Sequence, residues 1–215
     1  MTALTARYSS SPESTMEQDL GRLRGIRDSK GFLENIDQLV ADILTEDFWN
    51  ISLPNALATS AASSPSLNAY YAALNLLDAR VLFSKIKVVD LIDPALKANR
   101  AALERHHLFP KDYLKNELDI TEIRDQNQIA NLALAEWFDN LDISNRPPMD
   151  YFPDFIEKAK NNRGLNEADL QNMYYWHALP EGWTSMPYED FLVMRRLSMA
   201  KVIRAGFETL RGKTG

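Results

Sequence analysis

The chain of 215 residues contains no cysteine, and this absence excludes disulfides and zinc sites built from thiolates. It also lacks any apolar run close to the roughly 18 residues that a membrane-spanning helix needs. Its first residues, MTALTARYSSSPE, do not show the basic segment and apolar stretch of a secretory signal. We therefore expect a cytoplasmic protein with no membrane partner.

Glycine is also scarce, with 8 residues, and no segment has the glycine-rich pattern that binds nucleotide phosphates. We therefore expect no nucleotide hydrolysis by this chain. An excess of positive charge is missing too, since the net charge is −6, which argues against non-specific wrapping of nucleic acid. The last segment, 195–215, is the exception, with six basic residues and one acid. This asymmetry is compatible with one basic face on an acidic body.

What the sequence does contain is the composition of a folded, mainly helical protein. Hydrophobic residues make up 45% of the chain and charged residues 25%. The spacing of the apolar residues predicts helices over about 14–26, 32–48, 67–80, 166–176 and 188–211, a loop over 52–66 and a strand over 131–135. The segment 86–93 is compatible with either helix or strand.

Two of the three histidines, His106 and His107, are adjacent. Neighbouring residues on an extended strand point to opposite sides, so one ring can be buried while the other faces a site. Downstream, Asn131 and Asn140 are nine residues apart, which leaves room for a short strand and a turn into a helix. A strand carrying the histidines, a partner strand and a crossing helix would bring the four side chains together. Alternatively, the histidines are a structural pair and the asparagines are turn and cap residues.

The wider sequence around these residues resembles a known family. The segments HHLFPKDYLK and NQIANLALAEWFDNLDISNRPPMDYF resemble the HNH motif of the ββα-metal nucleases. More narrowly, they are similar to the C-terminal nuclease half of GmrSD-type modification-dependent restriction proteins. The flanks RYSSSPESTMEQDL and HALPEGWTSMPYEDFLVMRRLSMAKVIRAGFETL resemble the same family, so the likeness extends over nearly the whole chain.

The resemblance implies a role for each of the four residues. His107 matches the general base that takes a proton from the water attacking a DNA phosphodiester. His106 occupies the preceding position, which ligates a single divalent metal, and Asn140 stands where the last residue of the motif supplies a second ligand. Asn131 matches the middle asparagine, which holds the base in orientation. Asparagine rather than histidine at position 140 makes the motif an HNN variant.

A cation held by one imidazole, one amide oxygen and water is more typical of Mg²⁺ or Mn²⁺ than of zinc. Binding of such a cation should be weak until DNA contributes phosphate oxygens. We also expect phosphate contacts from four basic residues: Arg146, Lys201, Arg204 and Arg211. A solvated helix surface is the alternative for the last three.

These observations predict a mainly α protein with a small embedded ββα-metal (HNH) motif. The motif occupies about 101–160, between a helical region at 1–100 and a C-terminal helical region with a basic tail at 161–215. The expected function is metal-dependent DNA endonuclease activity in a restriction or anti-phage system, with modified phage DNA as the target. The family's NTPase-like sensor domain is absent from this chain, so sensing would belong to another domain or subunit.

Two alternatives stand beside this interpretation. The first is an HNH-fold module that binds DNA or protein without cutting. The second is a structural helical subunit with an incidental histidine pair. Double-strand cleavage by a one-metal site would require two copies, but no pattern in the sequence specifies a homodimer.

Overall fold

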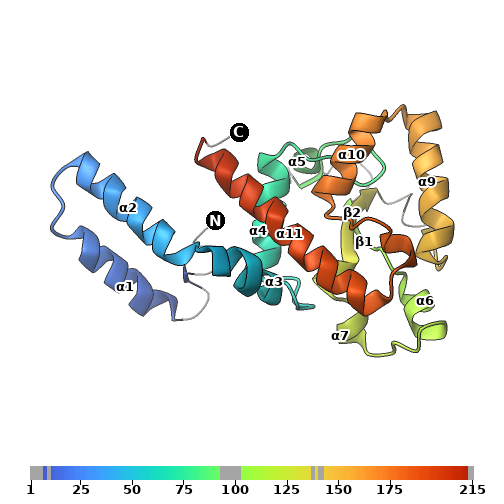
Figure 1. Cartoon of the computed structure of the whole chain (residues 1–215), viewed down its shortest axis with the longest axis horizontal. Coiled ribbons are helices and arrows are strands. Elements are labelled where there is room, and N and C mark those ends of the chain that lie inside the picture. The colour runs from blue at the N-terminus through green and yellow to red at the C-terminus, as the bar shows by residue number, and fades with distance from the viewer. Residues whose placement is uncertain (1–6, 9–10, 93–102, 137–138, 140–142, 213–215) are drawn as a thin grey trace.

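The computed structural model describes residues 7–8, 11–92, 103–136, 139 and 143–212. The fold is mainly helical, with 65% helix and 5% strand, as the sequence predicts. The strands form a two-stranded antiparallel sheet, which lies among the helices (Figure 1).

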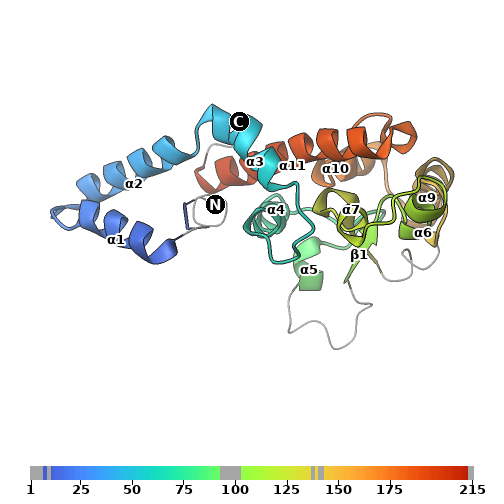
Figure 2. The same cartoon turned by 90° about the horizontal axis from the view of Figure 1, so that it is seen from below.

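The N-terminal part is a helical hairpin. α1 (Pro12–Leu23) and α2 (Ser29–Ile43) are joined by the short segment 24–28. Asp28 caps α2, because its carboxylate accepts a hydrogen bond of 2.8 Å from the amide of Gly31. Figures 1 and 2 both show this hairpin extending away from the rest of the molecule.

The segment 52–66, expected to be a loop, is partly helical. The chain passes through η2 (Phe48–Ser52) into α3 (Leu53–Ala56), and α4 (Pro65–Leu76) begins before the loop was expected to end. The prolines explain the error, because a proline in the first turn of a helix starts it rather than breaks it. The segment 86–93 contains α5 (Val88–Ile92), so its helical alternative is the correct one.

The histidine pair lies on the sheet. β1 (Leu103–His107) pairs antiparallel with β2 (Leu132–Glu136), so that His106 faces Ala133 and His107 faces Leu132 across the strands. The strand expected over 131–135 is therefore confirmed within one residue. The connection between the strands holds three short helices: α6 (Lys111–Asn116), α7 (Ile123–Gln126) and η4 (Ile129–Asn131).

The C-terminal part consists of α9 (Pro148–Arg163), α10 (Glu167–Trp176), η5 (Trp183–Ser185) and α11 (Tyr188–Leu210). α10 and α11 match the predicted helices closely, whereas no bounds were predicted for α9 beyond the expectation of a helix crossing the strands. Gly164 ends α9 with a φ of 65°, a left-handed conformation that glycine adopts without strain.

The core joins all three predicted regions of the chain. α11 packs along α4, and one cluster of buried residues runs from Phe48 to Ile203. Near the sheet, the ring of Phe109 lies 4.9 Å from that of Phe191, and Phe152 lies 4.9 Å from Trp183. The regions 1–100, 101–160 and 161–215 therefore share their packing. Within the described ranges, no helix is both long and apolar enough to span a membrane.

Candidate active site

The alternation of β1 places the two histidines in different surroundings. His106 is buried, with 2% of its surface exposed, whereas His107 is half-buried. This agrees with the expectation that one ring of the pair is enclosed while the other faces outward. The enclosed ring is the one expected to ligate a metal, and the half-buried ring is the expected base.

His106 lies against Tyr151 of α9. Its Nε2 is 3.3 Å from the tyrosine hydroxyl, and the two rings are perpendicular. The hydroxyl donates its own proton to the carbonyl of Leu108 at 2.8 Å, so it accepts from Nε2 of His106. In the neutral form of the ring, the proton is then on Nε2.

His107 faces the segment between the strands. Its Nε2 is 3.0 Å from Oδ1 of Asn127. Burial lowers the pKa of His107 below its ordinary value of 6.5, and the positive charge of Lys111 lowers it further, while the bond to Asn127 opposes both. The ring is therefore neutral at physiological pH, the state in which an imidazole can accept a proton.

Asn131 joins the end of β1 to the start of β2. It is fully buried, its Oδ1 accepts from the amide of Phe109 at 2.8 Å, and its Nδ2 donates to the carbonyls of Phe109 and Gln126 at 3.0 and 3.1 Å. Its own carbonyl accepts from the amide of Leu108 at 2.8 Å. Asn131 thus fixes the two residues that directly follow His107, and with them the position from which that ring projects.

Arg195 of α11 holds the chain on both sides of Asn131. Its fully buried guanidinium donates to the carbonyls of Ala130 at 2.7 Å and Leu132 at 2.9 Å, and to that of His177 at 3.1 Å. Charge-assisted bonds to three carbonyls compensate in part for burying the cation. The predicted basic tail therefore begins with an arginine that is part of the core.

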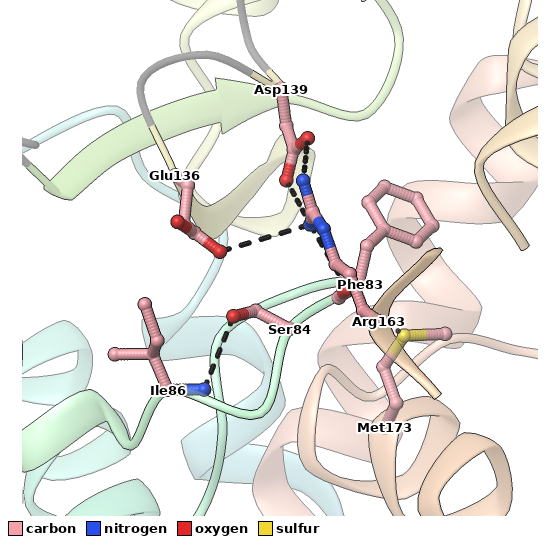
Figure 3. Close-up of polar contacts among 7 residues, drawn as sticks. All are labelled: Phe83, Ser84, Ile86, Glu136, Asp139, Arg163 and Met173. Atoms are coloured by element: carbon pink, nitrogen blue, oxygen red, sulfur yellow. Dashed lines mark hydrogen bonds and ion pairs between the residues drawn. The ribbon is translucent and has the colours of Figure 1, made fainter. Parts of the chain in front are cut away.

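Asn140, the expected second metal ligand, lies outside the described residues. Its neighbour Asp139 is buried and bound by both terminal nitrogens of Arg163, at 2.7 and 2.6 Å (Figure 3). Arg163 also donates to the carbonyl of Phe83 at 3.0 Å and lies 3.7 Å from the carboxylate of Glu136. α9 thus fixes the chain immediately before Asn140.

Two of the residues expected to contact DNA, Arg204 and Arg211, lie toward the C-terminal end of α11. Arg204 pairs with Glu46, and Arg211 pairs with Asp37 at 3.0 Å, so both side chains reach toward the N-terminal helices. Figures 1 and 2 show this end of α11 near α2 and α3, well separated from the sheet. Lys201 is an exposed residue of the same helix.

Arg146, the fourth basic residue, precedes α9. It forms an ion pair with Asp154 and donates to the carbonyl of Asp150 at 2.8 Å. The charges of Arg146, Arg204 and Arg211 are thus already paired with carboxylates. A DNA phosphate would have to replace those carboxylates as a partner.

Three residues of the site were not anticipated from the sequence: Tyr151, Asn127 and Arg195. Tyr151 and Arg195 come from helices far along the chain, so no local spacing indicates them. Asn127 is four residues before Asn131, but the pattern of the motif gives it no role.

Among the residues that the structure describes, no group of three or more histidine and carboxylate side chains could hold a metal ion. The expected ligand pair of His106 and Asn140 is not such a group, and half of it lies outside the described ranges. Comparison of the chain with family models, curated proteins and solved structures finds no significant match.

Proposed function

We propose that this chain is a metal-dependent DNA endonuclease of the HNH type, acting in the cytoplasm as the cleavage part of a restriction system. One observation carries the proposal. The amide of Asn131 bonds both backbone groups of Phe109, two residues after His107, and so joins the two strands beside the candidate base. This is the role that the middle asparagine of the HNH motif would have.

In the proposed reaction, His107 takes a proton from the water that attacks a DNA phosphorus. Its lowered pKa supports this role, because the ring is neutral and ready to accept a proton at pH 7. Oδ1 of Asn127 accepts a bond from Nε2, which leaves Nδ1 as the basic atom of that tautomer. Asn131 acts through the backbone, as a positioning residue.

His106 and Asn140 would hold the divalent cation, Mg²⁺ or Mn²⁺. The hydrogen bond from Nε2 of His106 to Tyr151 fits such a role, because metal-binding histidines commonly donate their other N–H to a neighbour that fixes the tautomer. When bound, the cation would stabilise charge on the scissile phosphate and its leaving oxygen. The target would be DNA, with modified phage DNA as the expected form, and sensing would fall to a subunit or to a domain outside residues 1–215.

The burial of His106 favours a second candidate function, a module of this fold that binds DNA or protein without cutting. With 2% of its surface exposed, the ring can reach a cation only if its surroundings move. If the chain is such a binding module, the contact between His106 and Tyr151 only stabilises the core, and the sheet supports a surface that binds DNA or protein.

The experiment that tests the proposal is cleavage of supercoiled plasmid by the purified chain with Mg²⁺ or Mn²⁺. The variants are His107→Ala and a matched control, Glu117→Gln, which changes an exposed residue between the strands. Removal of a general base should slow cleavage by roughly 10²–10⁴-fold, while the control should cut like the parent chain.

Binding of Mn²⁺, measured by calorimetry, separates the two candidates when the parent chain does not cut. Binding that weakens in both His106→Ala and Asn140→Ala would retain the nuclease proposal, in which cutting then requires a separate sensor. Cleavage that persists in His107→Ala would refute it in favour of the binding module. So would the lack of any Mn²⁺ binding at the high concentrations at which a weak site is occupied.

A further inference from the structure

The α1–α2 hairpin carries an apolar face that the described part of the chain leaves uncovered. Asp19 is the only buried residue of its two helices, and its carboxylate is bound by Arg7 and Tyr8. Several large apolar side chains are exposed to solvent: Met16 (51%), Leu20 (64%), Phe32 (46%) and Leu33 (61%). Between the helices, a groove is lined mainly by Met16, Leu20, Leu23, Ile36 and Leu39, together with Tyr8 of the preceding segment and a few polar residues of the helices.

Such a hairpin has little stability by itself. Its helices have 12 and 15 residues, and isolated helices of this length are marginal in water. An amphipathic helix gains its stability by burying its apolar face against another element. The hairpin extends away from the body in both views, and α11 contacts it through the ion pair of Arg211 with Asp37 (Figures 1 and 2). The described part of the body therefore leaves the apolar face exposed.

The charges of the hairpin are divided between its two ends. All four basic residues lie in the segment 22–30, which we call the tip: Arg22, Arg24, Arg27 and Lys30. The parts of the hairpin outside the tip, 12–21 and 31–43, contain six acids and no basic residue: Glu13, Glu17, Asp19, Glu34, Asp37 and Asp42. Asp19 and Asp37 are bound by Arg7 and Arg211, which lie outside the hairpin, so the other four acids carry its excess negative charge. The hairpin is therefore basic at its free end and acidic toward the body.

We propose that a second copy of this chain covers the apolar face, with the two hairpins packed antiparallel about a twofold axis as a four-helix bundle. A twofold interface requires a surface that is complementary to itself. The antiparallel arrangement meets this requirement, because it lays the basic tip of each hairpin beside the acidic part of the other. A parallel arrangement would bring the two basic tips together.

The same distribution disfavours other occupants. An acidic partner, nucleic acid included, would match the tip but meet the acids outside it that no arginine binds. A basic partner would match those acids but meet the tip. The second copy carries both charges in the required order and supplies an equal apolar face. This inference does not depend on the proposed nuclease activity.

The test measures the mass of the full chain by light scattering and sedimentation equilibrium. The parent chain should be a dimer whose affinity falls as salt is raised. The variant Leu20→Glu/Leu33→Glu places charge on the apolar face and should raise the dissociation constant at least a hundredfold. Ile123→Glu is the matched control: its side chain is 71% exposed on α7, and its dimer should equal that of the parent chain.

A charge exchange tests the antiparallel arrangement specifically. Arg24→Glu/Arg27→Glu should dissociate the dimer, because acids then face acids. Adding Glu13→Arg/Glu17→Arg to the same chain should restore it, because tip and acidic part exchange signs together. All four residues are exposed, so circular dichroism should show unchanged helix content in each variant.

Three outcomes would overturn the proposal. The first is a parent chain that remains monomeric at about 100 µM, well above a micromolar dissociation constant. The second is an unchanged dimer in Leu20→Glu/Leu33→Glu. The third is a charge exchange that does not restore association, which would exclude the antiparallel arrangement. Since mass is measured and not cleavage, failure here leaves the nuclease proposal to its own experiment.

Discussion

Replacement of Asn131 by aspartate gives the sharpest test of how the site is held together. Aspartate has nearly the same shape and keeps an oxygen that can accept from the amide of Phe109. It replaces Nδ2, however, and so loses the bonds of 3.0 and 3.1 Å to the carbonyls of Phe109 and Gln126. A carboxylate oxygen would then face two carbonyl oxygens in a fully buried position.

The expected loss of stability follows from these contacts. Each lost hydrogen bond lowers the free energy of unfolding by about 1 kcal/mol, and a buried charge without a partner raises the total to about 3–5 kcal/mol. For a chain of this size, that corresponds to a fall in the melting temperature of roughly 10 °C. The new carboxyl would have a raised pKa in the folded protein, so the deficit should shrink as the pH is lowered.

The assay is urea unfolding followed by circular dichroism, with Asn161→Asp as the control. Asn161 is exposed on α9, so the same chemical change there should shift stability by less than about 0.5 kcal/mol. If Asn131→Asp were as stable as the control, the contacts of Asn131 would not hold the chain after His107. The positioning role assigned to Asn131 would then fail.

Two further predictions concern groups near the site. Burial lowers the pKa of His177 from 6.5 to about 3, so below about pH 6.5 the unfolded chain binds a proton that the folded chain does not. The free energy of unfolding should therefore fall by about 1.4 kcal/mol per pH unit below pH 6.5. Urea titrations at several pH values should show that His177→Gln lacks this part of the slope. Equal slopes in the variant and the parent chain would contradict a lowered pKa for His177. Arg163→Met leaves the buried carboxylate of Asp139 without its main partner and should cost about 2–3 kcal/mol, reduced by the partial exposure of the arginine. Asp139→Asn/Arg163→Met should recover part of that loss in the same assay, and a double variant no better than the single one would show that the pair is not coupled.

The sequence predicts the parts of the fold that depend on local patterns. Apolar spacing places the helices near 166–176 and 188–211, and alternation places the strand near 131–135. The same alternation predicts that His106 and His107 have different surroundings. These features are set by neighbouring residues, so one sequence is enough to find them.

The parts that the sequence does not predict depend on contacts between distant segments. Arg204 and Arg211 form ion pairs with Glu46 and Asp37, which lie 158 and 174 residues away along the chain. Tyr151 reaches His106 only because α9 packs beside the sheet. No periodicity in the sequence encodes such pairs.

The position of Arg195 in the chain has a consequence for the order of events during synthesis. The sheet and Asn131 leave the ribosome well before α11, whose guanidinium holds the carbonyls of Ala130 and Leu132. Until that helix has emerged and packed, the loop between the strands lacks its last support. A nascent chain would thus carry both histidines without a finished site, and its proposed capacity to cut DNA would arise only after α11 has been synthesised and has packed.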